Sequence, residues 1–534
     1  MSVTKQVITT LLSLTGTRRV FTYPGSPPRY VYEAVIKSNA ELVTAVREQH
    51  LLHLAQAEYF QTLEQGTEQI PVVVVSADLG EAMASQGLLA GSITSPCIIV
   101  VAEESFPHVE NAVNIAHQTD RATTHQSLDD TEPLQRHENV ATRAHITDED
   151  DLTTVGDVVE TVRTQQEIGI IHLPLYADTD EPTAASILSD YTPDQVSLTE
   201  LENRWMAADR PLLIVGRGIR DPTVRDRIAD IAETGGVPIT TTLQMDGYFD
   251  TNHVGRIGTV GTPSANEAFN QADLVVALGS SVNNLITSYD PAVIQEFQSK
   301  TIQVDVNPRR RSVFTDSWIP ERSNTVVDRL DGREAALWTD TQYNQNGKME
   351  RVPDPVQGVA AAIRDHCPET VVTLGVGNAM IWMTYALGPT IRKEVARTGS
   401  MGEVVAGLHW GDPPILVLGD GEFEMDLSLL TEAQHQGTTP VICVVNNERL
   451  GLVTERQEAE FGERLTEKYP APINYEELGR AFADVESFST TTAGEAREAV
   501  SQAVRSDVVS VIEVRVEDRL SADIFDISTL PRTA

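Results

Sequence analysis

The stretch 415–453 constrains the fold of this 534-residue chain more than any other part of the sequence. An apolar run (415–418) leads into the turn GDG (419–421), and a second apolar run (441–445) leads into NN (446–447). The 24 residues between the two turns are enough for a helix and its connections. Apolar runs with this separation predict two buried parallel strands joined by a helical crossover. Both polar turns then lie at carboxyl ends of strands, where open α/β sheets bind ligands.

The residues of these two turns have the chemistry of a metal diphosphate site. Asp420 and Asn447 offer hard oxygen ligands, while Gly419 and Gly421 let the backbone approach a phosphate closely. Mg²⁺ in proteins is typically held by one or two carboxylates together with phosphates and water. We therefore expect the two strand ends to hold the magnesium complex of a diphosphate.

The GDG…NN pattern resembles the cofactor motif of the thiamine diphosphate-dependent enzymes. The resemblance implies that Asp420 and Asn447 bind Mg²⁺ together with the backbone carbonyl of Arg449, and that Glu422 also belongs to the cofactor site. The segment NNERLGLVTERQ, which begins at Asn446, is most similar to NNEEQGMVTQWQ of the acetohydroxyacid (acetolactate) synthase branch.

Two further segments match this family in order and spacing, and a third supplies one more candidate cofactor residue. GSMG (399–402) resembles GTMG or GSMG of the family, which implies that Ser400 contacts the cofactor and that Met401 props it into its bent conformation. GVGNAMIW (375–382) resembles GVGQHQMW, which contacts the diphosphate, with Asn378 in place of the glutamine. Gly25, in VFTYPGS, is assigned to the cofactor site by the same resemblance.

The amino-terminal region contains the candidate catalytic acid. Glu48, in VREQH, follows an apolar strand and precedes a helix, and the segment resembles the family's R-HEQ-A. The resemblance implies that Glu48 faces N1′ of the cofactor's aminopyrimidine, where its carboxyl group favours the imino tautomer that deprotonates the thiazolium. A glutamate in an apolar site of this kind should have a raised pKa. Read without the family, Glu48 is a solvated acid at a helix start.

Alternating apolar strands and helix-like stretches predict an α/β fold of three doubly wound parallel-sheet domains. We expect them at residues 1–180, 195–345 and 355–534, with polar linkers at 178–199 and 340–354. In the resembling family these are the pyrimidine-binding, central and diphosphate-binding domains. One cofactor must contact Glu48 in the first and Asp420 in the third. The resemblance therefore implies a homodimer, or a dimer of dimers, with sites shared across a two-fold axis.

The central domain departs from acetolactate synthases, which bind FAD there in a non-redox role. Synthases carry GARFDDR where this chain has GSSVNNL (279–285), so Leu285 replaces the arginine that engages the second 2-oxo acid. Arg456 stands where synthases place a tryptophan of the substrate pocket. A glycine turn at 216–218 follows a strand and is a weak phosphate signal. These departures count against bound FAD and against the synthase reaction.

Three functions therefore remain open. The first is an acetolactate synthase-like carboligase that decarboxylates one 2-oxo acid and joins the product to another. The second is a simple decarboxylase of the sulfopyruvate, phosphonopyruvate or benzoylformate type, in which a histidine from the region of 105–140 can donate a proton. His125 is the best candidate there, although most histidines of this region are expected to be surface or turn residues. The third is a non-catalytic homologue, against which the retention of Glu48, Asp420 and Asn447 argues.

The net charge of −38 and the six lysines describe the surface rather than the reaction. A strongly negative field argues against nucleic acids and anionic membranes as partners. The Debye length falls to about 3 Å at molar salt, so the repulsion is screened there, and the composition resembles that of halophile proteins. Cys97 and Cys443 lie in apolar strands and are expected to be buried. The chain has no CxxC pair, no cleavage site after its amphipathic start and no apolar run of 18 residues, so we expect a cytoplasmic protein without disulfides or zinc.

Overall fold

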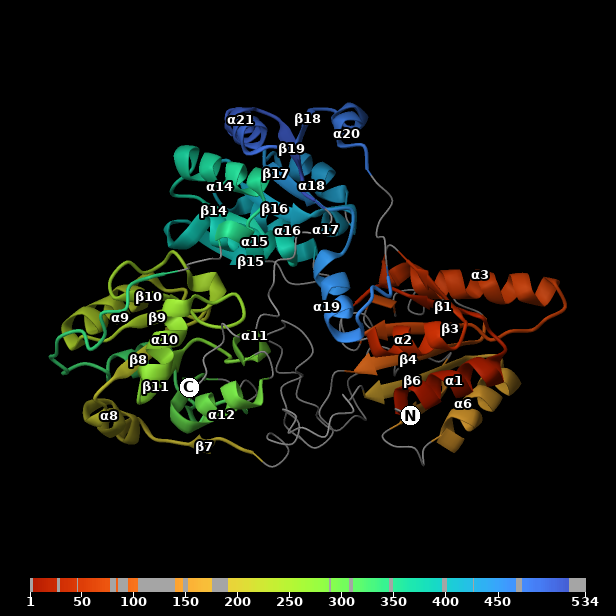
Figure 1. The fold of residues 1–534 in the computed structure, drawn as a ribbon, viewed down its shortest axis with the longest axis horizontal. Helices are drawn as coiled ribbons and strands as arrows, with labels where there is room; N and C mark the ends of the chain where they lie inside the picture. Colours follow the sequence, from red (N-terminus) through yellow and green to blue (C-terminus); the bar gives the residue numbers. More distant parts are fainter. Residues whose placement is uncertain are drawn as a thin grey trace. The chain divides into compact units, whose positions relative to one another are not determined.

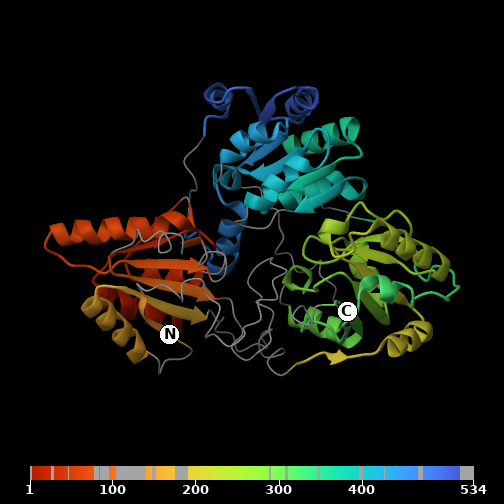
Figure 2. The same ribbon diagram turned by 180° about the vertical axis from the view of Figure 1, so that it is seen from behind.

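Three parallel sheets organise the chain (Figures 1 and 2). The computed structural model describes residues 3–25, 29–45, 47–76, 83–84, 95–103, 140–146, 152–174, 191–287, 290–306, 311–344, 349–395, 401–425, 427–466 and 473–517. The chain divides into two compact units. The first comprises Met1–Ala116, Thr123–Glu181 and Val453–Tyr469, and the second comprises His117–Ala122, Pro182–Leu452 and Pro470–Ala534.

The first unit contains a six-stranded parallel sheet with the order β2-β1-β3-β4-β6-β5. Its strands are β1 (Arg19–Thr22), β2 (Glu41–Thr44), β3 (Val72–Ser76), β4 (Cys97–Glu103), β5 (Val140–His145) and β6 (Ile168–Pro174). Alternate residues of a strand face opposite sides of the sheet. Val72 and Val74 accordingly pack with α1 (Val3–Thr15), α2 (Arg29–Lys37) and α6 (Leu152–Gln165), whereas Val73 and Val75 pack with α3 (Leu51–Glu64). Both faces are covered, which explains why the inner strands β3 and β4 are almost continuously apolar.

The second unit contains two sheets. The central sheet has the order β10-β9-β8-β11-β12-β13-β7, and the carboxy-terminal sheet has the order β15-β14-β16-β17-β19-β18. The central strands are β7 (Asp194–Gln195), β8 (Pro211–Val215), β9 (Ile239–Thr241), β10 (His253–Arg256), β11 (Leu274–Leu278), β12 (Thr301–Val304) and β13 (Ser317–Ile319). The carboxy-terminal strands are β14 (Val371–Leu374), β15 (Arg392–Val395), β16 (Ile415–Gly419), β17 (Val441–Asn446), β18 (Val485–Thr490) and β19 (Val509–Arg515). All of these pairings are parallel, so the predicted fold class of three parallel α/β domains is confirmed.

Helices complete both layers of the second unit. Around the central sheet lie α8 (Leu198–Ala207), α9 (Pro222–Gly235), α10 (Pro263–Gln271), α11 (Asn284–Thr287), α12 (Pro291–Lys300) and α13 (Ser323–Val327). The carboxy-terminal sheet is accompanied by α14 (Asp354–His366), α15 (Asn378–Leu387), α16 (Met401–Ala406), α17 (Asp420–Met425), α18 (Ser428–Gln436), α20 (Tyr475–Ala481) and α21 (Ala493–Ala503). Helix α19 (Gly451–Phe461) begins in the second unit and continues in the first. The stretch 178–199, expected to be a linker, contains β7 and the start of α8, because β7 pairs with β13 at the sheet edge.

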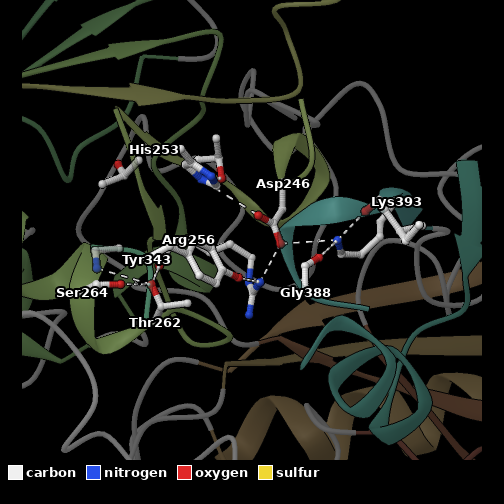
Figure 3. A network of polar contacts seen from close by, with 12 residues as sticks. Asp246, His253, Arg256, Thr262, Ser264, Tyr343, Gly388 and Lys393 are labelled. Atoms are coloured by element: carbon white, nitrogen blue, oxygen red, sulfur yellow. Dashed lines mark hydrogen bonds and ion pairs between the residues drawn. The ribbon is translucent and has the colours of Figure 1, made fainter. Parts of the chain in front are cut away.

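A buried charge network joins the central and carboxy-terminal sheets (Figure 3). Asp246, Arg256 and Lys393 are all fully buried, and Oδ2 of Asp246 lies 2.5 Å from Nη1 of Arg256 and 3.4 Å from Nζ of Lys393. Arg256 also donates a hydrogen bond, at 2.5 Å, to the hydroxyl oxygen of Tyr343. Tyr343 lies in the stretch 340–354, which was expected to be the second linker. Burial lowers the pKa of Lys393 to about 8 against the opposing effect of Asp246. The network anchors the edge strand β15, which contains Lys393, to the central domain.

Two further observations concern the cysteines and the membrane. Cys97 and Cys443 are buried as predicted, and the three cysteines of the chain are free thiols. Within the described ranges, none of the helices has the length and apolar character needed to cross a lipid bilayer.

Candidate functional site

The predicted site residues of the second unit follow three neighbouring strands of the carboxy-terminal sheet. Asn378 begins α15 after β14, Asp420 begins α17 directly after β16, and Asn447 follows β17. A Cβ atom placed on Gly451 would lie 2.6 Å from Nδ2 of Asn378 and 2.7 Å from Nδ2 of Asn447. Both amides therefore lie against this glycine, and the structure brings together residues separated by about 70 positions.

Asp420 is the acid at the centre of this rim. It is 3% exposed; its Oδ1 accepts a hydrogen bond from the N–H of Gly421 at 2.9 Å, and its Oδ2 accepts one from the N–H of Arg449 at 3.2 Å. Burial nevertheless raises the pKa of Asp420 to about 7, because these N–H donors do not offset the loss of water. A cation beside the carboxylate would stabilise its ionised form. The contact with Arg449 joins the GDG turn to the NN turn, as a shared metal site requires.

The donors of this rim fit a magnesium ion that is also bound by phosphate oxygens. Among the described residues, no three His, Cys, Asp or Glu side chains gather as a metal cluster. A metal at this rim would therefore use one carboxylate, from Asp420, with amide and carbonyl oxygens from Asn447 and Arg449. A ligand set with so few protein charges is typical of Mg²⁺ held jointly with phosphates.

The two asparagines of the NN pair have different surroundings. Nδ2 of Asn446 donates to Oε1 of Glu513 at 2.6 Å, and Oδ1 of Asn446 accepts from the N–H of Glu448 at 3.0 Å. The amide of Asn447 instead lies beside Gly451. The amide of Asn446 is therefore held by Glu513 and Glu448, whereas that of Asn447 lies beside Gly451 and Asn378.

Glu422 connects the ends of β14 and β16. Its Oε2 would lie 1.6 Å from a Cβ atom on Gly375, so the carboxyl group occupies the space that only a glycine leaves there. Burial raises the pKa of Glu422 to about 8, although the N–H groups of Val376 and Gly419 donate to the carboxyl group. Gly377, with φ of 118°, then turns the chain into α15. The N–H groups in the first turn of a helix such as α15 point toward its amino-terminal end, where an anion can accept from them.

The first unit contributes a second buried acid. Glu48 begins a short 3₁₀ helix (Glu48–His50) ahead of α3, and burial raises its pKa. The hydroxyl oxygen of Tyr32 accepts hydrogen bonds from Oγ1 of Thr22 (3.2 Å) and the N–H of Gly25 (3.1 Å), and Tyr32 donates to the carbonyl of Tyr23. Burial is the main cause of the raised pKa of Tyr32, and the charge of Glu48 adds to it, so this hydroxyl lies within the electrostatic reach of Glu48. Gly25 and Glu48 thus share Tyr32 as a neighbour.

Comparison with protein-family models identifies the domains in which Glu48 and Asp420 lie. The amino-terminal TPP binding domain of thiamine pyrophosphate enzymes matches residues 1–132, the central domain matches 200–313, and the carboxy-terminal TPP binding domain matches 375–514. The chain belongs to the thiamine pyrophosphate enzyme family. The first match contains Glu48 and the third contains Asp420, so the two acids lie in the two domains of this family that bind the cofactor.

The curated proteins to which this chain is similar include acetolactate synthases. The chain is 27% identical to an acetolactate synthase large subunit of Parasynechococcus marenigrum over 282 residues, which are 48% of this chain and 46% of the relative. It is 23% identical to a probable acetolactate synthase large subunit of Methanocaldococcus jannaschii over 58% of this chain and 61% of the relative. An acetolactate synthase of Arthrospira platensis is 25% identical over 48% and 50%. The matched region spans about half the length of these relatives.

Some residues predicted from the family segments lie outside what the structure describes. Ser400 and His125 are outside the described residues. Met401 is the first residue of α16, Leu285 lies in α11 and Arg456 in α19.

Sequence reasoning missed Tyr32 and Glu513. Tyr32 could have been suspected, because a tyrosine just past a glycine turn, on an otherwise apolar helix face, often uses its hydroxyl locally. The contact of Glu513 joins residues 67 positions apart and left no local signal.

Proposed function

We propose that this member of the family is a thiamine diphosphate- and Mg²⁺-dependent enzyme that acts on 2-oxo acids by acetolactate synthase-like carboligation after decarboxylation. The observation that carries the proposal is the buried carboxylate of Asp420, joined to the NN turn through the N–H of Arg449. In this proposal Asp420, Asn447 and the carbonyl of Arg449 hold the metal. Gly419, Gly421, Glu422, Asn378, Ser400, Met401 and Gly25 line the cofactor site.

The bound cofactor supplies an electron sink for loss of carbon dioxide from a 2-oxo acid. Glu48 holds the proton that is shared with the aminopyrimidine ring nitrogen. Its burial favours the protonated carboxyl group, as its raised pKa indicates, so a hydrogen bond to that nitrogen can form without a buried negative charge. Asp420 would hold the metal that binds the diphosphate. The first N–H groups of α15 provide further donors.

Two sets of residues must act on one cofactor, so we also propose a homodimer, or a dimer of dimers, with two-fold-related sites. Helix α3 supports this part of the proposal, because its large apolar side chains Leu54, Phe60 and Leu63 are 38%, 43% and 47% exposed. Exposed apolar side chains on one helix are suited to burial by a second copy. The charge of −38 supports a halophilic, cytoplasmic protein, and the free cysteines agree with a reducing compartment.

A simple 2-oxo acid decarboxylase is the second candidate. Leu285 and Arg456 favour it, because they replace the arginine and the tryptophan with which synthases engage the acceptor. A non-catalytic homologue is the third, and the retained acids Glu48 and Asp420 argue against it. FAD is not part of the proposed cofactor set.

Product analysis tests the proposal. The purified protein, supplied with Mg²⁺ and thiamine diphosphate, would be fed a panel of 2-oxo acids singly and in pairs, and the products would be identified by NMR. Carboligation gives 2-hydroxy-2-alkyl-3-oxo acids, whereas simple decarboxylation gives aldehydes. Glu48→Gln is the control, and turnover that survives this substitution would remove Glu48 from the mechanism. Absence of decarboxylation from every substrate would favour the non-catalytic homologue.

A further inference from the structure

Glu513 contacts the NN turn from a neighbouring strand. It lies on β19, is 1% exposed, and faces Asn446 at the end of β17. Its Oε1 accepts from Nδ2 of Asn446 at 2.6 Å, and its Oε2 accepts from Oγ of Ser489 on β18 at 2.6 Å. Nε of the more exposed Arg515 lies 3.0 Å from Oε1. Three adjacent strands, β17, β19 and β18, are thus tied together through one carboxylate.

This carboxylate determines which way the Asn446 amide points. An ionised carboxylate only accepts hydrogen bonds, so the Nδ2 end of Asn446 must face Glu513. The Oδ1 end is then directed at the N–H of Glu448, which it accepts at 3.0 Å. If the amide were reversed, Oδ1 of Asn446 would lie against the carboxylate oxygen of Glu513, and its Nδ2 would lie against the N–H of Glu448.

The hydrogen bond to Glu448 stabilises an unusual backbone conformation. Glu448 has φ of 55°, a left-handed value that non-glycine residues rarely adopt without local support. The turn at Glu448 separates Asn447 from Arg449, which are two of the proposed metal ligands. It also directs the N–H of Arg449 to Oδ2 of Asp420, which is the third proposed metal ligand. The conformation of Glu448 therefore affects how Asn447 and Arg449 are placed relative to Asp420.

We propose that Glu513 and Asn446 are positioning residues for the metal site: the acceptor-only carboxylate of Glu513 orients the Asn446 amide, and this amide holds the left-handed turn that presents Asn447 and the Arg449 carbonyl. The inference rests on the proposed function, because it concerns how the Mg²⁺ site is shaped. It assigns different tasks to two adjacent asparagines, with Asn446 supporting the turn and Asn447 binding the metal.

A donor–acceptor swap tests the proposal. Asn446→Asp keeps the shape but sets a carboxylate against that of Glu513, which removes the hydrogen bond and adds repulsion. Glu513→Gln keeps an acceptor for Asn446 and offers its amide N–H to Ser489. The double variant restores the contact with reversed polarity, because the glutamine amide then donates to the aspartate. Glu486→Gln is the matched control, because Glu486 on β18 accepts a hydrogen bond from Oγ of Ser510 on β19 at 2.7 Å. These are the two strands that the contact between Glu513 and Ser489 also joins.

The measurement is a calorimetric titration of Mg²⁺ into each full-length protein in the presence of thiamine diphosphate. Asn446→Asp is expected to weaken apparent Mg²⁺ affinity by about 10–100-fold, the range typical of lost supporting contacts at metal sites. The double variant should remain within about threefold of wild type, since the glutamine amide then donates to the aspartate. Glu513→Gln, whose side chain no longer only accepts, should weaken Mg²⁺ affinity, though less than Asn446→Asp does, and unchanged affinity in this variant would remove Glu513 from the orientation. The Glu486→Gln control should bind as wild type does.

The possible results of these titrations separate the positioning role of Glu513 and Asn446 from the proposed function. Unchanged Mg²⁺ affinity in Asn446→Asp, even with a lower melting temperature of the cofactor-free protein, would show a merely structural role and overturn the inference alone. A double variant as weak as Asn446→Asp would overturn the proposed orientation mechanism. A wild-type protein that binds neither Mg²⁺ nor thiamine diphosphate would overturn the proposed function as well.

Discussion

The central and carboxy-terminal sheets of the second unit share a parallel architecture but use their carboxyl ends in opposite ways. At the central sheet, the N–H groups of Gly216 and Gly218 donate to the carbonyls of Leu278 and Gly279, both at 2.9 Å. At the carboxy-terminal sheet, Asp420 and Asn447 lie on a rim with Gly451 and the Arg449 N–H. The first end is closed by its own backbone, whereas the second carries the side chains that we propose as metal ligands.

This contrast shows what a glycine turn after a strand can and cannot indicate. A Cβ atom on Gly216 would lie 2.5 Å from the Gly279 oxygen, so the glycine allows two loops to touch. The N–H groups that could have bound a phosphate are used inside the protein. At GDG the glycines flank a buried acid whose pKa is raised by its burial. The accompanying residues, and not the glycines, distinguish a ligand site from a packing contact.

The largest expected effect is the loss of cofactor binding on Asp420→Ala. The substitution removes the strongly anionic ligand and leaves an amide, a carbonyl and the diphosphate for the metal. We expect Mg²⁺-dependent thiamine diphosphate affinity to fall by more than the roughly 10–100-fold typical of losing a contact that only supports a metal ligand. Calorimetry with and without Mg²⁺ measures it, and unchanged affinity would refute the metal site. Stability without cofactor should not fall, because removing a buried carboxylate relieves its desolvation.

The second-largest expected effect concerns Glu48, the buried acid of the first unit. Inactive Glu48→Gln and inactive Asp420→Ala proteins, mixed under subunit exchange, should recover about a quarter of wild-type activity. Random pairing in a two-fold dimer makes half of the dimers mixed, each with one intact site of two. The assay needs proof of exchange, for example by native mass spectrometry. Exchange without recovered activity, or an active monomer, would contradict sites shared between subunits.

Gly216→Ala should show the opposite pattern to Asp420→Ala. Its methyl group would collide with the backbone of Gly279 and Ser280, and overpacking of this kind typically costs about 1–3 kcal/mol of unfolding free energy. Mg²⁺ and thiamine diphosphate affinity of the folded variant should stay unchanged. Urea unfolding and calorimetry on the same preparation measure both. A loss of cofactor affinity without a loss of stability would mean that the central end also serves the cofactor.

The parallel sheets were predictable because their strands are buried on both faces. Ile415, Leu416, Val417 and Leu418 are all inaccessible to solvent, and such continuous apolar runs carry the signal of a central parallel strand. The placement of Asp420 and Asn447 at the carboxyl ends of neighbouring strands was predictable because each directly follows such a run. The structure brings them onto one rim, as that prediction requires.

The supporting contacts were not predictable, because they join distant parts of the sequence. Asp246 and Lys393 are 147 positions apart and meet only after two domains have packed. The pairing of Asn446 with Glu513 depends on the register of β17 and β19. The stretch 178–199 looked like a linker because it is acidic and contains proline and threonine, but the two-residue strand β7 is too short to show a periodic pattern.

The smallest expected effect is that of added FAD. The family segment GARFDDR is replaced by GSSVNNL, and the nearby N–H groups of Gly216 and Gly218 already donate to backbone carbonyls. The purified protein should therefore be colourless, and excess FAD should leave its melting temperature and the flavin fluorescence unchanged. Mg²⁺ with thiamine diphosphate, added to the same preparation, should raise the melting temperature, because a ligand that binds only the folded state stabilises it. A stoichiometric flavin absorption band after purification would show that the central end is open to a nucleotide despite these contacts. The two carboxyl ends would then differ in which ligand they bind rather than in whether they bind one.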